Sequence, residues 1–87
     1  MNPNITIRRA HPDDLFSLAT LFDLYRQFYE CPSDMEAARN WLQHNLEAQR
    51  SVIFTADTGS ELLGFTQLYP ALCSVDLVEY FVLYDLY

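Results

Sequence analysis

The sequence contains no lysine, only two glycines and only two cysteines in 87 residues. All five basic residues are arginines, and twelve acidic residues bring the net charge to −7. This balance argues against a nucleic-acid-binding protein, which needs a basic surface to contact phosphates. It is compatible with cationic small molecules such as amines, although a solvated acidic surface explains the charge more simply.

The two cysteines, Cys31 and Cys73, lie far apart and show neither CxxC nor Cys/His spacing. We therefore expect no metal site and no disulfide framework. Residues 1–5 lack the basic and apolar regions of a signal peptide, and no apolar run is long enough to span a bilayer. The expected location is the cytoplasm.

Hydrophobic residues make up 51% of the chain and aromatic residues 15%, with six tyrosines and six phenylalanines. This composition predicts a packed core and a single domain over residues 1–87. So many aromatic side chains indicate a ligand pocket, a partner surface, or a core whose other half is absent. The last two explanations together are favoured, because large exposed apolar surfaces mark interfaces.

The first third of the chain reads as a strand followed by a helix. Residues 5–10 alternate apolar and polar side chains, which predicts a short strand. A helix is expected over residues 12–29, with His11 as its N-cap and Pro12 in its first position. Its apolar positions form two neighbouring stripes, and polar positions such as Asp23 and Arg26 are expected to face water.

A second helix is expected after the break at Cys31-Pro32. Ser33 and Glu36 have the spacing of a capping box, which makes Ser33 the expected N-cap. The helix should continue to about Gln49. Trp41 belongs to its apolar face and is expected to be buried.

Two strands, residues 51–56 and 61–69, are expected to pair as a hairpin around a turn in which Gly59 can adopt positive φ. A brief loop at residues 71–73 should then lead to a last strand. That last stretch, residues 74–87, is rich in β-branched and aromatic side chains and reads as the most buried strand. No turn or polar tail follows it, which favours a domain cut off at an open sheet edge.

The order of these elements resembles the N-terminal half of a GNAT-type (GCN5-related) N-acetyltransferase. The resemblance rests on four segments taken together: residues 5–10 (ITIRRA), 12–14 (PDD), 63–70 (LGFTQLYP) and 82–87 (VLYDLY). It implies an α/β (α+β) fold of the acyl-CoA N-acyltransferase type. The expected order is β-α-α-β-β-β, a mostly antiparallel sheet with two helices.

The resemblance also implies acetyl-CoA as the acyl donor, with Leu86 and Tyr87 in contact with it. Relatives hold its pyrophosphate in a loop of the form R/Q-x-x-G-x-G/A at a helix N-terminus, where backbone N–H groups cradle phosphates. Neither Gly59 nor Gly64 lies in such a loop, which is expected beyond Tyr87. The chain alone should therefore bind acetyl-CoA weakly or not at all.

The acceptor amine is expected between the first helix and the last two strands. The residues that the resemblance places there are Tyr25, Phe28, Tyr29, Gln67, Tyr69 and Tyr84. Aromatic faces can hold a cationic amine, and an amide side chain can orient it. A purely structural role in the core is slightly favoured for each residue taken singly.

No catalytic base can be assigned from the sequence. Glu79 and Asp85 are the late acidic residues, but strict alternation along a strand puts them on the face opposite Val82, Tyr84 and Leu86. A solvated or salt-bridged position is favoured for both, and the family's general-acid tyrosine falls outside the chain.

The expected function is N-acetyl transfer from acetyl-CoA to an amine of a small molecule or peptide, with this chain alone impaired or inactive. The main alternative is a non-catalytic module that dimerises, or binds a partner chain, through its open sheet edge. A complete ligand-binding domain with an aromatic pocket ranks third.

Overall fold

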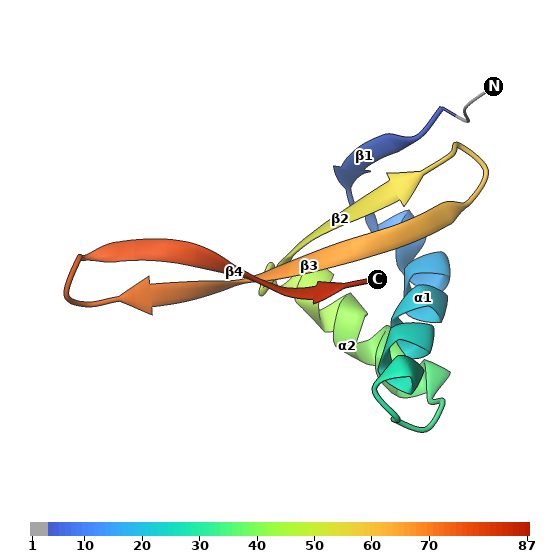
Figure 1. Cartoon of the computed structure of the whole chain (residues 1–87), viewed down its shortest axis with the longest axis horizontal. Helices are drawn as coiled ribbons and strands as arrows, with labels where there is room; N and C mark the ends of the chain where they lie inside the picture. Colours follow the sequence, from blue (N-terminus) through green and yellow to red (C-terminus); the bar gives the residue numbers. More distant parts are fainter. Residues whose placement is uncertain (1–3) are drawn as a thin grey trace.

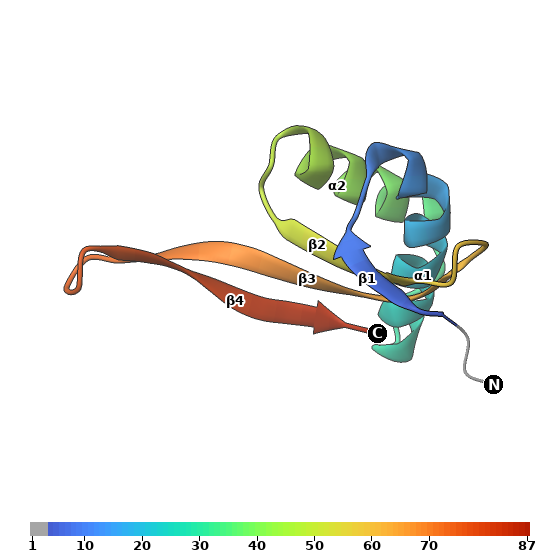
Figure 2. The ribbon, with the colours of Figure 1, turned by 90° about the horizontal axis from the view of Figure 1, so that it is seen from above.

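The computed structural model describes residues 4–87, which form a four-stranded antiparallel sheet with both helices on one face (Figures 1 and 2). The sheet order follows the chain, β1-β2-β3-β4. The elements are β1 (Thr6–Arg9), a 3-10 turn η1 (Pro12–Asp14), α1 (Leu15–Phe28), α2 (Met35–Glu47), β2 (Val52–Asp57), β3 (Leu62–Cys73) and β4 (Val78–Leu86). The expected element order and fold class are confirmed.

His11 is a cap, as expected, but it caps the 3-10 turn η1 that leads into α1, and the α-helix itself begins only at Leu15. The His11 ring nitrogen Nδ1 accepts a hydrogen bond from the Asp13 N–H at 3.1 Å, and the His11 N–H donates to Asp14 at 2.7 Å. Arg8 on β1 then joins two carboxylates, Asp14 at 2.7 Å and Asp57 at 2.9 Å. These ion pairs connect β1 to the start of α1 and to the end of β2.

The link between the two helices corrects two expectations. Asp23 does not face water: it is buried, and its carboxylate accepts hydrogen bonds from the Ser33 hydroxyl at 2.6 Å and the Asp34 N–H at 2.7 Å. The N-cap of α2 is Asp34, whose side chain accepts from the Ala37 N–H, and not Ser33. Asp23, on the preceding helix α1, thus fixes the loop before α2. These hydrogen bonds join residues that are far apart in the sequence, so local spacing cannot reveal them.

The core lies between the helices and the covered face of the sheet. It consists of Leu18, Ala19 and Phe22 from α1, Ala38 and Leu42 from α2, Ile53 from β2 and Phe65 from β3. Burial of such side chains is the main source of folding free energy. Trp41 was expected in this core, but it is 46% exposed and lies at its edge.

β2 and β3 form the expected hairpin, and Gly59 in its turn has φ +95°. Their pairing ends at Leu68, but β3 itself continues through Pro70 to Cys73, paired with β4. The expected loop at residues 71–73 is therefore wrong. Pro70, which has no N–H to donate, is tolerated because β2 no longer lies beside β3 at this position. No backbone carbonyl on that side therefore needs a donor from Pro70.

The paired segment of residues 70–82, here called the arm, extends away from the helices as a long hairpin (Figure 1). Within β4 only Asp85 is buried. The expectation that this is the most buried strand is therefore wrong for residues 4–87: its apolar composition is real, but no helix of the described chain covers it. No helix in the described part of the chain is long and apolar enough to cross a membrane.

Candidate functional site

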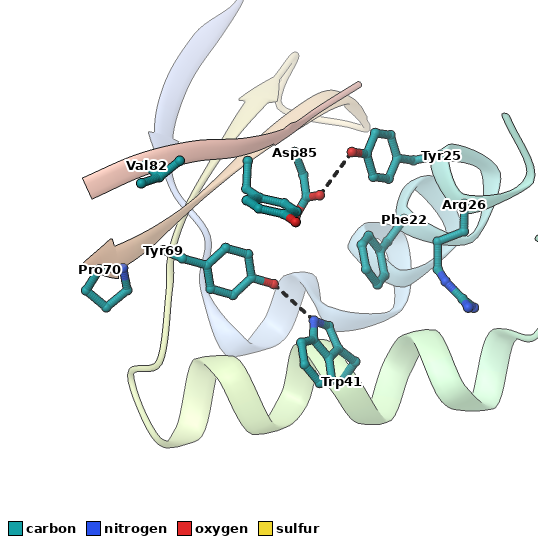
Figure 3. A pocket seen from close by; sticks show the side chains of 9 residues that line it. Phe22, Tyr25, Arg26, Trp41, Tyr69, Pro70, Val82 and Asp85 are labelled. Atoms are coloured by element: carbon teal, nitrogen blue, oxygen red, sulfur yellow. Dashed lines mark hydrogen bonds between the residues drawn. The ribbon is translucent and has the colours of Figure 1, made fainter. Parts of the chain in front are cut away.

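A cavity of about 610 Å³ opens where both helices approach the base of the arm (Figure 3). Its walls come from four elements. They are Phe22, Tyr25 and Arg26 of α1, Trp41 of α2, Tyr69 and Pro70 of β3, and Val82, Tyr84 and Asp85 of β4. The walls are therefore mostly aromatic, with one acidic and one basic side chain.

A β-bulge decides which β4 side chains reach this cavity. Gln67 pairs with Asp85, but the next β3 residue, Leu68, pairs with Leu83, so β4 has one additional residue at this point. Tyr69 pairs with Val82, which puts Val82 and Asp85 on the same face of the sheet. The expectation that Asp85 lies opposite Val82 and Tyr84 is therefore wrong, because strict alternation fails at the bulge. Glu79 is exposed.

Asp85 is 7% exposed and is held by two neutral donors. The Tyr25 hydroxyl donates to one carboxylate oxygen at 3.0 Å, and the Gln67 amide donates to the other at 2.9 Å. Within residues 4–87 Asp85 forms no salt bridge, so its expected solvated or salt-bridged position is not observed. Each oxygen keeps a lone pair for a further donor.

The two donors are themselves fixed. Burial, followed by the hydrogen bond to Asp85, raises the pKa of Tyr25 well above its ordinary value, so this hydroxyl keeps its proton. The Gln67 carbonyl oxygen accepts from Ser51 at 2.7 Å and from Asn45 at 2.9 Å. This network determines the orientation of the Gln67 amide, so its NH₂ group points at Asp85.

Aromatic rings form much of the remaining wall. The Trp41 indole donates to the Tyr69 hydroxyl at 3.1 Å (Figure 3), and the Tyr69 and Tyr84 rings meet edge to face with centroids 5.7 Å apart. The Arg50 guanidinium lies over the Trp41 ring, 4.9 Å from its centroid. These contacts explain why a partly exposed tryptophan holds a defined position.

The predicted acceptor residues divide into three groups. Tyr25, Tyr69 and Tyr84 line the main cavity. Gln67 is buried behind it and acts on Asp85. Tyr29 lines a neighbouring cavity, whereas Phe28 lies outside every cavity described here and is largely exposed. Their roles in binding an acceptor stay predictions.

Leu86 and Tyr87, the predicted acyl-donor contacts, differ in their backbone groups. The Tyr87 N–H and C=O both pair with Phe65 at 3.0 Å. Leu86 pairs with Thr66 at the next position, where an antiparallel ladder directs the N–H of the edge strand away from its neighbour. Of the two, Leu86 therefore presents a backbone donor at the free edge of β4.

Sequence reasoning missed six residues of the cavity wall, namely Phe22, Arg26, Trp41, Pro70, Val82 and Asp85. Trp41 had been assigned to the core, Arg26 to the solvent and Asp85 to a solvated or salt-bridged position. The signal for Asp85 lay in its sequence position next to Tyr84, but only the bulge brings both side chains to one cavity.

Comparison with known proteins identifies acetyltransferases. The chain is 41% identical over 83 residues to an uncharacterized N-acetyltransferase, YhfO, of Bacillus subtilis (strain 168), covering 95% of this chain and 56% of that protein. It is 32% identical over 71 residues to a probable acetyltransferase of Haemophilus influenzae, covering 80% and 49%. The chain thus spans about half the length of the curated relatives it matches, and no family model matches it.

Solved structures agree. The crystal structure of a probable acetyltransferase matches with a TM-score of 0.88 and 39% identity over 94% of this chain and 56% of that one. A possible acetyltransferase from Clostridium difficile 630 shares the fold, with a TM-score of 0.83 at 16% identity over 95% and 56%. A GNAT family acetyltransferase of Staphylococcus aureus also shares the fold, with a TM-score of 0.74 at 12% identity over 94% of this chain and 60% of that one. In sequence and fold, the chain is therefore similar to about half the length of proteins named as acetyltransferases.

Proposed function

We propose that this chain forms the amine-accepting side of an enzyme that transfers an acetyl group from acetyl-CoA to a small molecule or peptide. The observation that carries the proposal is Asp85, a buried carboxylate without a cationic partner in residues 4–87, set in an aromatic cavity. The acetyltransferase names of the relatives supply the reaction class.

A cavity of this kind favours an ammonium group. Removing a carboxylate from water is costly unless a cation or hydrogen bonds compensate, so a ligand cation gains from completing the site. The faces of Trp41, Tyr69 and Tyr84 add attraction for a positive charge. An amine must lose a proton before it attacks a carbonyl carbon, and Asp85 is the carboxylate that could accept it.

The described residues account for only part of a binding site for acetyl-CoA. Acetyl-CoA would supply the thioester whose carbon–sulfur bond breaks as the amide bond forms. Leu86 offers a backbone donor at the β4 edge, but neither glycine belongs to a phosphate-binding loop. Gly59 occupies the β2–β3 turn, and a Cβ on Gly64 would lie 2.6 Å from the Tyr87 carbonyl oxygen. We therefore expect calorimetry on this chain to detect no micromolar binding of acetyl-CoA.

Trp41 is the single tryptophan, so its fluorescence reports on the cavity wall directly. We expect phenethylamine to change this fluorescence saturably, and Asp85→Asn to weaken its binding roughly tenfold or more, because a charged hydrogen bond is lost. Glu79→Gln is the control, since Glu79 is an exposed acid on the same strand.

Thermal melts of both variants verify that they are folded, and Asp85→Glu keeps the charge should Asp85→Asn fail to fold. No saturable signal with the wild-type chain, or equal affinities of wild type and Asp85→Asn, would contradict the proposal.

The alternative of a non-catalytic module retains one supporting observation: β4 is an edge strand whose side chains, Asp85 excepted, are exposed. Such an edge can pair with a second copy or with another chain. In that case light scattering should show a stable dimer, and a folded monomer would count against it. A cytoplasmic location stays a prediction.

A further inference from the structure

Arg26 stands apart from the other four arginines of the chain. Arg8 pairs with two carboxylates, Arg9 lies over Phe54, Arg50 lies over Trp41, and Arg39 is exposed on α2. Arg26 is half-buried, yet within residues 4–87 its guanidinium makes no hydrogen bond, ion pair or aromatic stack. A guanidinium in such a position has its donors free for a ligand.

The nearest acid in sequence does not need Arg26. Asp23 lies three residues earlier on α1, but its carboxylate already accepts from Ser33, the Asp34 N–H and Gln27. These hydrogen bonds, and only lastly the charge of Arg26, hold the pKa of Asp23 below its usual range. Arg26 is therefore not the counter-ion on which Asp23 depends.

Three cavities meet at Arg26. It lines the main cavity with Asp85, a cavity of about 230 Å³ against Ala37 and Ala38 of α2, and one of about 360 Å³ beside Tyr29 and Cys31. Figure 3 shows Arg26 on the α1 side of the main cavity, beyond Phe22 as seen from Asp85. One cavity thus carries a carboxylate at β4 and a free guanidinium at α1.

We propose that the acceptor is a dipolar molecule, a primary amine that also carries an anionic oxygen group, with its ammonium at Asp85 and its anion at Arg26. The inference rests on the proposed function for the position of the amine. The planar guanidinium fork matches the geometry of a carboxylate or a phosphate. In a chain of net charge −7, a free anion has no general attraction to the surface, so this local donor decides where it binds.

Matched ligands test the proposal through Trp41 fluorescence. 4-(2-Aminoethyl)benzoate and phenethylamine differ only in a carboxylate, which the ring holds away from the amine, and phosphoethanolamine and ethanolamine differ only in a phosphate. We expect the wild-type chain to bind at least one anionic member roughly tenfold more tightly than its partner. The pair that shows the larger preference identifies carboxylate or phosphate as the anion.

Arg26→Gln should abolish that preference while leaving the affinity for the plain amine unchanged. Arg39→Gln is the matched control, because it removes an exposed arginine from α2 that lines none of the described cavities. Arg26→Lys keeps the charge without the fork and should restore only part of the preference.

The two proposals fail differently. If no amine binds, or if Asp85→Asn binds amines as well as wild type, the proposed function is wrong. If phenethylamine binds through Asp85 but neither anionic ligand binds more tightly than its partner, only the inference about Arg26 is wrong. Equal weakening of both members of a pair by Arg26→Gln would also overturn it.

Discussion

The helix-covered body and the arm are built from the same kinds of residue but bury them very differently. In the body, α1, α2, β2 and the first half of β3 enclose Leu18 and Leu42, which are completely buried. In the arm, Leu72 is 80% exposed although it belongs to a regular paired strand. Figure 2 shows the reason, because the helices cover only the body end of the sheet.

This difference shows that a segment can form a regular paired strand without its side chains being buried. Backbone pairing with β4 satisfies the hydrogen bonds of the arm whether or not anything covers its side chains. Apolar side chains there contribute to stability only if a further surface packs on them. The cavity lies at the boundary, with walls from the body and from the base of the arm.

The largest expected contrast comes from matched truncations. Leu42→Ala should lower the free energy of unfolding by about 3 kcal/mol, because it leaves a void in the core. Leu72→Ala, the same change in the arm, should alter it by less than about 0.5 kcal/mol. Chemical denaturation of both variants measures the difference. A large loss from Leu72→Ala would break the comparison and would mean that the arm is covered in solution.

A smaller effect is expected from a buried carboxylate of the body. Asp23→Asn should lower the melting temperature by several degrees, because it weakens the hydrogen bonds to Ser33 and the Asp34 N–H that hold the start of α2. Asp76→Asn in the turn of the arm is the control and should leave the melting temperature unchanged. Circular dichroism melts compare the two, and equal shifts would contradict this role for Asp23.

The smallest and most gradual effect is the acid dependence of the body. Hydrogen bonds and Arg8 lower the pKa values of Asp14 and Asp57, so both carboxylates stabilise the fold above their ordinary pKa of about 4. This contribution is lost as the pH falls through their lower folded values. Melts from neutral to acid pH should show the loss, and Arg8→Gln should flatten it. An unchanged acid profile in Arg8→Gln would contradict the assignment.

Local patterns in the sequence were sufficient for the order of the elements, the His11 cap and the Gly59 turn. They failed where the outcome depends on packing between distant segments. Asp23 reads as a solvated helix position because its hydrogen-bond partners belong to the next loop. Trp41 reads as core, but Tyr69 and Arg50 hold it at the edge.

The site was predictable only as a region. The family resemblance pointed to the first helix and the last strands, and three of the predicted tyrosines do line the cavity. The charges of that cavity were missed, since the orientation of Asp85 depends on a one-residue bulge and the freedom of Arg26 depends on Asp23 being satisfied by others. Neither the bulge nor the hydrogen bonds of Asp23 can be recognised from the periodicity of the sequence.

The bulge in β4 also means that the length of the strand, and not only its composition, sets the chemistry of the cavity. The bulge takes up one residue between Val82 and Asp85, which is why both face the cavity although they lie three positions apart. A strand with one residue fewer between them would keep Asp85 on that face by simple alternation, whereas a straight strand of the same residues would pair Tyr84 with Gln67 and turn Asp85 to the other face. The one additional residue thus decides whether this position of the cavity holds an acid or a phenol, without a change in the identity of any side chain.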